Sequence, residues 1–194
     1  MSDEDDILLA AVREEVLAYG VRRATATSIA QRAGVSRVTV YRRGGGIKQL
    51  VLDALVTEFQ RAMTEVTLRA AEQVQPGNAR ESVVAISAEL VDTLSRAPLV
   101  AALLEHDPDL LLPYLVDRHG RSQLLVLDAL TSALSEGHAD GSVRDADPRV
   151  LAEVLLHALT PFVVGSRVLT VTHDPAQIRD EIRHLVDSYL APSR

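Results

Sequence analysis

The segment from Thr25 to Arg43 gathers side chains that can bind a charged partner. It reads TATSIAQRAGVSRVTVYRR, and its second half is rich in hydroxyl and guanidinium groups. Such groups donate hydrogen bonds to phosphate oxygens and to the edges of bases. The segment therefore offers recognition chemistry, and the residues that supply it are Ser36, Arg37, Thr39, Tyr41, Arg42 and Arg43.

Two short helices are predicted to position these side chains. Thr25 or Thr27 can cap the first helix, which ends at Ala33, and Gly34 suits the left-handed position that closes it. Ser36 can cap the next helix, which runs to about residue 43. This helix–turn–helix pattern is typical of proteins that place the second helix in the major groove of DNA.

The charge distribution agrees with a DNA-binding segment. The net charge of the chain is −7, yet residues 16–52 hold seven bases and no acid. A basic block inside an acidic chain is the electrostatic signature of nucleic-acid binding, although a solvated Arg-rich face would look the same. Arg22 and Arg23 are expected to contribute general electrostatic attraction to DNA and not to read its sequence.

The rest of the chain predicts an all-α fold of about nine helices. No stretch alternates with the period of two that a strand needs. The long segment 109–136 is expected to break or kink near Pro113 or Gly120. The other helices beyond the basic block are expected at 47–73, 80–96, 98–104, 148–169 and 175–190, and one precedes it at 5–19.

Composition argues against several other classes of protein. The chain has no cysteine, and it shows no nucleophile elbow and no glycine-rich phosphate loop, so we expect no enzyme, no cofactor and no metal site. His106, Asp107 and Asp109 fit a helix-capping connector better than a metal site. The uncharged run at 154–166 is too short to span a membrane. With an acidic N-terminus, a cytoplasmic protein is expected.

The segment resembles the TetR family of bacterial transcriptional regulators. The residues that carry this resemblance are Thr25, Ile29-Ala30, Ala33-Gly34-Val35-Ser36, Thr39-Val40-Tyr41, Lys48 and Leu50. The chain departs from the family at Gly44, where a Phe is usual, and the spacing from Tyr41 to Lys48 is one residue longer. The triple glycine at 44–46 should make this turn looser.

The resemblance implies two domains and a set of DNA contacts. Residues 1–50 would form the DNA-binding domain, and residues 51–194 a helical domain for effector binding and dimerisation. Contacts to the DNA backbone would come from Thr25, Ser36, Thr39, Tyr41 and Lys48, with Arg37 and Arg42 nearer the bases and Arg43 beside them. Alternatives stay open: Thr25 and Ser36 could act only as helix caps, and Tyr41 could pack against the fourth helix.

The resemblance also implies a homodimer and an unknown small-molecule effector. Dimerisation would use the last two helices, 149–169 and 175–190, and the first of them is apolar nearly all round. The few aromatic residues favour an apolar, aliphatic effector. Candidate lining residues, for each of which core packing is an alternative, are Phe59, Met63, Leu90, Leu94, Leu103, His106, Tyr114, Leu127, His157 and Phe162. His157 is expected to be a hydrogen-bonded core histidine.

The leading hypothesis is a ligand-responsive transcriptional regulator, acting as a repressor, that binds palindromic operator DNA as a homodimer. An alternative is a helical small-molecule-binding or scaffold protein that has lost operator binding.

Overall fold

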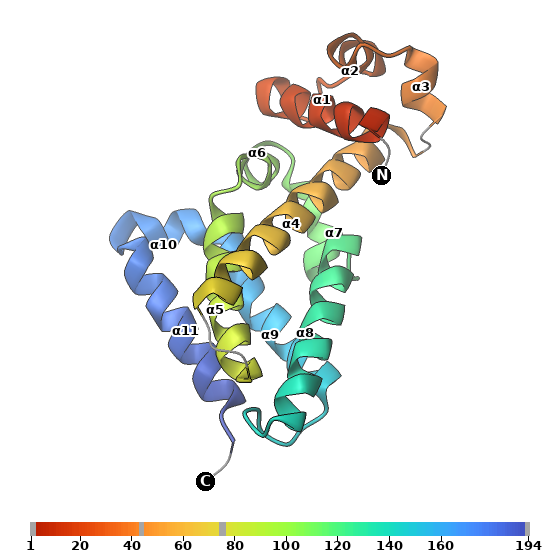
Figure 1. Cartoon of the computed structure of the whole chain (residues 1–194). Coiled ribbons are helices and arrows are strands. Elements are labelled where there is room, and N and C mark those ends of the chain that lie inside the picture. The colour runs from red at the N-terminus through yellow and green to blue at the C-terminus, as the bar shows by residue number, and fades with distance from the viewer. Residues whose placement is uncertain (1–2, 43–44, 74–76, 193–194) are drawn as a thin grey trace. The chain divides into compact units, whose positions relative to one another are not determined.

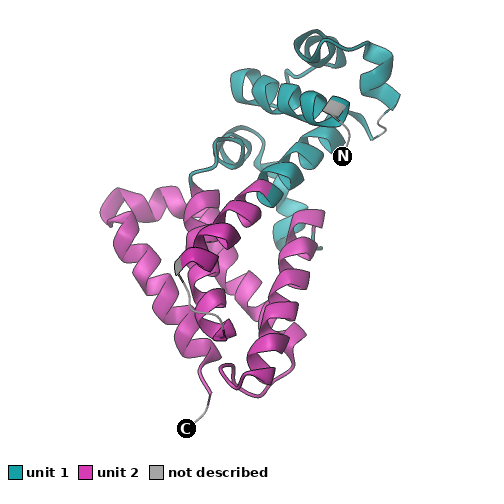
Figure 2. Ribbon diagram, in the orientation of Figure 1, with its two compact units in different colours: residues 1–60, 96–119 teal, residues 61–95, 120–194 magenta. Residues whose placement is uncertain are grey.

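The computed structural model describes residues 3–42, 45–73 and 77–192. Every regular element in these ranges is an α-helix (Figure 1), which confirms the all-α prediction. The chain divides into two compact units, coloured separately in Figure 2. Unit 1 comprises residues 1–60 and 96–119, and unit 2 comprises residues 61–95 and 120–194.

Unit 1 contains the predicted helix-turn-helix. Its helices are α1 (Asp3–Tyr19), α2 (Ala26–Ala33), α3 (Arg37–Arg42), the first part of α4 (Gly46–Gln73), α6 (Pro98–His106) and α7 (Pro108–Val116). Helix α1 packs on α2 and α6, and α2 packs on α3. The core between the first three helices is aliphatic and is built from Leu8, Val12, Val16, Ile29 and Val40.

Unit 2 is a bundle around α5. It holds the rest of α4 together with α5 (Ala79–Ser95), α8 (Arg121–Ala139), α9 (Pro148–Val164), α10 (Ser166–Thr172) and α11 (Pro175–Leu190). Helix α5 packs on α8, α9 and α11, and α8 packs on α9. Leu127, Leu134, Leu151 and Leu155 lie in its core and are almost fully buried.

Helix α9 is apolar on two faces, and only one of them is covered in this chain. Leu151, Leu155 and Leu159 are buried, at the spacing of one helix face. Val150 and Val154 lie on another face and are 56% and 44% exposed. The helix therefore has apolar residues on both faces, as predicted, and one of these faces is exposed in the single chain.

Two helix breaks differ in how well the sequence predicts them. The expected break in 109–136 falls at residues 117–120, between α7 and α8, while Pro113 lies inside α7. The segment 148–169, expected to be one helix, ends instead at Val164, and α10 begins at Ser166. A Cβ atom on Gly165 would lie 2.9 Å from the carbonyl oxygen of Pro161, so this close turn of the backbone requires glycine.

No single helix in the described ranges is long and apolar enough to cross a membrane. The pair α9 and α10, bent by 62°, meets the length and composition requirement together. Much of α9 lies in the core of unit 2.

The division at residue 50 is a functional prediction, between DNA contact and effector binding, and it stays a prediction. By packing, unit 1 also includes residues 51–60 and 96–119.

Candidate nucleic-acid interface

Local hydrogen bonds define both ends of α2. The Oγ1 atom of Thr25 accepts a 3.0 Å hydrogen bond from the backbone N–H of Ser28, and the Ser28 hydroxyl accepts one of 3.1 Å from the Thr25 N–H. Thr25, not Thr27, is thus the cap, in the reciprocal pattern of a capping box. Gly34 closes the helix with a φ of 67°. The turn predicted from the sequence is confirmed.

Helix α3 is capped by Ser36 and anchored by Val40. The Ser36 Oγ atom accepts a 3.1 Å hydrogen bond from the N–H of Thr39. Val40 is buried, with an exposed fraction of 3%. Successive residues of a helix are rotated by about 100°. When Val40 points into the core, most other side chains of α3 therefore point toward solvent. The exposed residues of α3 are Arg37, Val38, Tyr41 and Arg42.

The structure decides between the open alternatives for some of these residues. Thr25 and Ser36 do cap their helices, and both remain exposed. Tyr41 is 70% exposed, so the alternative in which it packs against α4 is wrong. Its phenol group is available to a partner outside the chain.

Two of the seven basic residues are neutralised within the protein. Arg32 lies 3.1 Å from Glu14 and 3.2 Å from Glu15, and these hydrogen bonds, the one to Glu14 first, raise the pKa of the guanidinium group. Arg22 lies 3.6 Å from Asp107. Arg32 thus joins α2 to α1, and Arg22 joins the segment after α1 to the connection between α6 and α7, so part of the charge of each is offset within unit 1.

Four of the other basic side chains face solvent. Arg23, Arg37, Arg42 and Lys48 are exposed, and within the described ranges they make no side-chain hydrogen bond or ion pair. Arg43 is outside the described residues. The free positive charge therefore lies on α3 and on the segments beside it, where the helix-turn-helix reading needs it.

The turn into α4 uses two glycines in the left-handed region. Gly45 has a φ of 75° and Gly46 a φ of 72°, and α4 begins at Gly46, one residue before the expected start. Lys48 lies in the first turn of α4 and is exposed. Gly44, the position of the family's usual Phe, lies outside the described residues.

The candidate effector-binding residues belong to both units and differ in burial. Unit 1 holds Phe59, Leu103, His106 and Tyr114, and unit 2 holds Met63, Leu90, Leu94, Leu127, His157 and Phe162. The four leucines are buried, whereas Phe59, Met63, Tyr114 and Phe162 are half-buried and the two histidines are exposed. Leu127 and Phe162 contribute to the core cluster of unit 2. Their role in effector binding stays a prediction.

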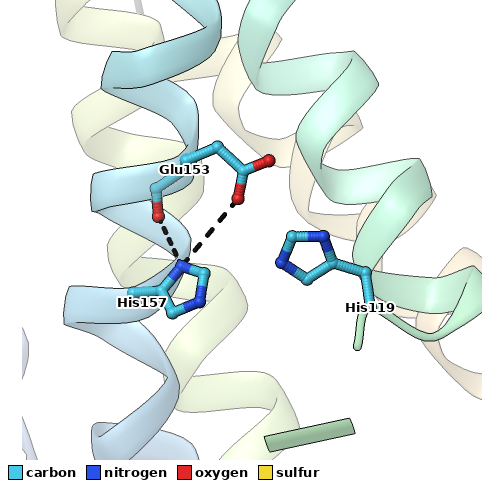
Figure 3. Close-up of side chains that lie close together, drawn as sticks. All are labelled: His119, Glu153 and His157. Atoms are coloured by element: carbon cyan, nitrogen blue, oxygen red, sulfur yellow. Dashed lines mark hydrogen bonds and ion pairs between the residues drawn. The ribbon is translucent and has the colours of Figure 1, made fainter. Parts of the chain in front are cut away.

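His157 is not a core histidine. Its Nδ1 atom donates a 2.8 Å hydrogen bond to the carbonyl oxygen of Glu153, one turn earlier in α9, and lies 3.9 Å from the Glu153 carboxylate (Figure 3). The side chain is 64% exposed. Figure 3 also labels His119, which belongs to unit 1. The expectation of burial was wrong because α9 leaves one of its apolar faces uncovered.

Two further residues matter at this site although the sequence pattern did not single them out for it. Val38 is 74% exposed on α3. The sequence signal for it was a second valine in a short helix whose core contact is already made by Val40. Asp107 is buried and accepts a hydrogen bond from the N–H of Val21. No local signal could reveal that contact, because the two residues are 86 positions apart.

Comparison with known proteins identifies the class. An uncharacterized HTH-type transcriptional regulator of Mycobacterium bovis is 30% identical over 189 residues, which cover 97% of this chain and 95% of the relative. No family model matches the sequence. The chain therefore belongs to the helix-turn-helix transcriptional regulators, and its fold is that of the TetR family.

Two solved structures show this fold. The TetR family repressor AlkX from Dietzia, implicated in biodegradation of n-alkanes, has a TM-score of 0.68 at 21% identity, covering 97% of this chain and 95% of AlkX. The transcriptional regulator FadR from Bacillus subtilis, in complex with stearoyl-CoA, has a TM-score of 0.66 at 14% identity, covering 95% of this chain and 98% of FadR. The resemblance predicted from the helix-turn-helix residues is confirmed.

Proposed function

We propose that this transcriptional regulator is a homodimeric repressor that binds a palindromic operator through α3 and releases it when a small apolar molecule binds. It acts in the cytoplasm, where the operator is. The observation that carries the proposal is the exposed surface of α3, where Arg37, Tyr41 and Arg42 stand clear of the protein. A helix that exposes such groups suits the major groove of DNA.

Each exposed group has a distinct task in the proposed complex. Guanidinium groups bind guanine edges or phosphates, so Arg37 and Arg42 would read bases or hold the backbone. Ser36, Thr39, Tyr41 and Lys48 would bind phosphates, which position the protein without specifying sequence. Thr25 joins them by resemblance to the family.

Dimerisation is proposed on the uncovered stripe of α9, assisted by α11. Val150, Val154, Ala158 and Pro161 follow one another at helical spacing and are exposed in the single chain. Leu185 on α11 is also exposed. A continuous apolar stripe of this kind is covered in most soluble proteins, and a second copy covers it symmetrically.

The proposed effector is aliphatic. The structure of FadR from B. subtilis contains stearoyl-CoA, and AlkX is implicated in biodegradation of n-alkanes. A long-chain acyl or alkyl compound is therefore the first class of effector to test. The chain's own support is a buried interior that is mostly Leu, Val and Ala. The effector would act by favouring a dimer whose recognition helices no longer match the groove.

The decisive experiment selects operators from random double-stranded DNA with the purified protein and then titrates the enriched sequence against salt. A palindrome should be enriched, and affinity should fall steeply with salt because phosphate contacts release counterions. The double variant Arg37→Ala, Tyr41→Ala should lose at least about tenfold in affinity, since two contacts are removed at each half-site.

Arg61→Ala is the matched control, because it removes an exposed positive charge from α4, outside the proposed interface. It should bind like the parent protein. If no sequence is enriched and the double variant behaves as the parent does, operator binding is refuted, and a helical ligand-binding or scaffold protein remains.

A further inference from the structure

The α3 surface carries one aliphatic side chain that no DNA contact proposed above uses. Val38 follows Arg37 directly and is 74% exposed. We propose that Val38 reads the C5-methyl group of one thymine in each operator half-site. This inference rests on the proposed function and makes Val38 a residue that determines sequence specificity.

Folding of unit 1 does not explain a valine at this position. Val40 supplies the aliphatic anchor of α3 and is buried, and residues two positions apart on a helix point about 200° from each other. Val38 therefore cannot reach the core that Val40 enters. A polar residue would serve an exposed position of a short helix at least as well, because β-branched residues have lower helix propensity.

The neighbours of Val38 indicate which surface it faces. Tyr41 and Arg42 lie three and four residues further on and share its side of the helix, and both are exposed. Val38 is thus set among the groups proposed to hold the DNA. It is the one aliphatic side chain that the described residues of α3 expose.

The chemistry of the major groove leaves one apolar partner for this side chain. Adenine, guanine and cytosine present hydrogen-bond donors and acceptors at the groove edge, whereas thymine also presents a methyl group. Burying a valine against a donor or acceptor would leave that polar group without a partner, which costs free energy. An A·T pair is therefore expected opposite Val38 in each half-site.

The test replaces thymine by deoxyuridine, which lacks only the methyl group, at each thymine of the selected operator in turn. Affinities are measured by fluorescence anisotropy at fixed salt. At one position, deoxyuridine should weaken binding about fourfold in one half-site and about fifteenfold in both, as expected for one buried methyl group per half-site. Val38→Ala should weaken binding to the thymine operator by a similar factor, and deoxyuridine should then cost less than about twofold.

Val116→Ala is the matched control, because it shortens another exposed valine of unit 1, on α7. It should keep the full deoxyuridine effect. Circular dichroism should show that both variants are folded, since both positions are exposed. The inference is overturned if the selected half-site contains no thymine, if no deoxyuridine weakens binding, or if Val38→Ala keeps the full effect, and in each case the regulator itself stands. If no operator is enriched at all, the proposed function fails together with the inference.

Discussion

The Oδ2 atom of Asp107 accepts a 2.9 Å hydrogen bond from the backbone N–H of Val21. Val21 lies just after α1, and Asp107 lies between α6 and α7. The contact therefore ties the chain entering the helix-turn-helix to the junction of two helices from the second half of unit 1. Arg22 adds an ion pair of 3.6 Å to the same carboxylate.

Replacing Asp107 by alanine should destabilise the protein by about 1–3 kcal/mol, because it leaves a buried N–H without an acceptor. Asp107→Asn keeps an oxygen that can accept the bond and should cost less. Urea unfolding followed by circular dichroism measures both. Asp109→Ala, which removes an exposed acid two residues later, is the control and should cost less than about 1 kcal/mol. Equal losses in Asp107→Ala and Asp109→Ala would refute the structural role of the contact.

The two carboxylates that bind Arg32 should differ in their contribution to stability. Glu15 is 3% exposed, and Glu15→Ala removes both its hydrogen bond to the charged Arg32 and the packing of its own buried side chain, so it should cost about 1–3 kcal/mol. Glu14 is exposed, and an exposed ion pair contributes about 0–1 kcal/mol. Thermal unfolding of the two variants side by side checks the order. The opposite ranking would mean that Arg32 is held chiefly by its exposed partner.

Asp140 should make the stability of unit 2 sensitive to acid. Hydrogen bonds from Ser142 and from the N–H of Ala79, the Ser142 side chain first, lower the pKa of this carboxyl below its usual value. A lowered pKa means that the ionised form stabilises the fold above the unfolded pKa, and that this stabilisation is lost as the pH falls through the folded pKa. Asp140→Asn should therefore be less stable than the parent at pH 7.

The difference between Asp140→Asn and the parent should shrink by pH 3, and urea midpoints at the two pH values measure it. Ser142→Ala removes the first-named hydrogen bond and should reduce the pH dependence in part. A difference that is the same at pH 7 and pH 3 would show that the charge of Asp140 does not stabilise the fold.

The proposed dimer should depend on Val154. Val154→Asp places two carboxylates at a symmetric contact, and desolvated like charges cost several kcal/mol, so the dimer should weaken at least about a hundredfold. Light scattering after size-exclusion chromatography measures the mass in solution. Leu124→Asp on α8 is the matched control, because Leu124 is 42% exposed and lies outside the proposed interface. A dimer that survives Val154→Asp but not Leu124→Asp would move the interface to α8.

Local chemistry explains why much of the site could be predicted. Thr25, Gly34 and Ser36 act through hydrogen bonds or dihedral angles within a few residues, so their types and spacing predict the turn wherever the rest of the chain lies. The buried position of α3, Val40, follows from helical periodicity in the same way. The family resemblance rests on these residues, and the relative at 30% identity confirms it.

Other features depend on partners far along the chain. The sequence counts Arg32 in the basic block, and only the packing of α1 on α2 shows that Glu14 and Glu15 neutralise it. The break at Gly165 was missed because glycine inside an apolar run also occurs within helices, and the close carbonyl of Pro161 appears only in three dimensions. His157 was expected in the core because periodicity shows that a helix is apolar all round, but not which face is covered.

By itself, then, the sequence determined the all-helical class and the helix-turn-helix, since these depend on local hydrogen bonds, backbone dihedral angles and helical period, and it supplied the candidate residues that we propose for DNA contact. The tertiary structure alone decided which charges remain free, that Tyr41 and Val38 face outward, and that Asp107 holds Val21. Burial and ion pairing are properties of two segments together, and residues 86 positions apart meet only when the chain has folded.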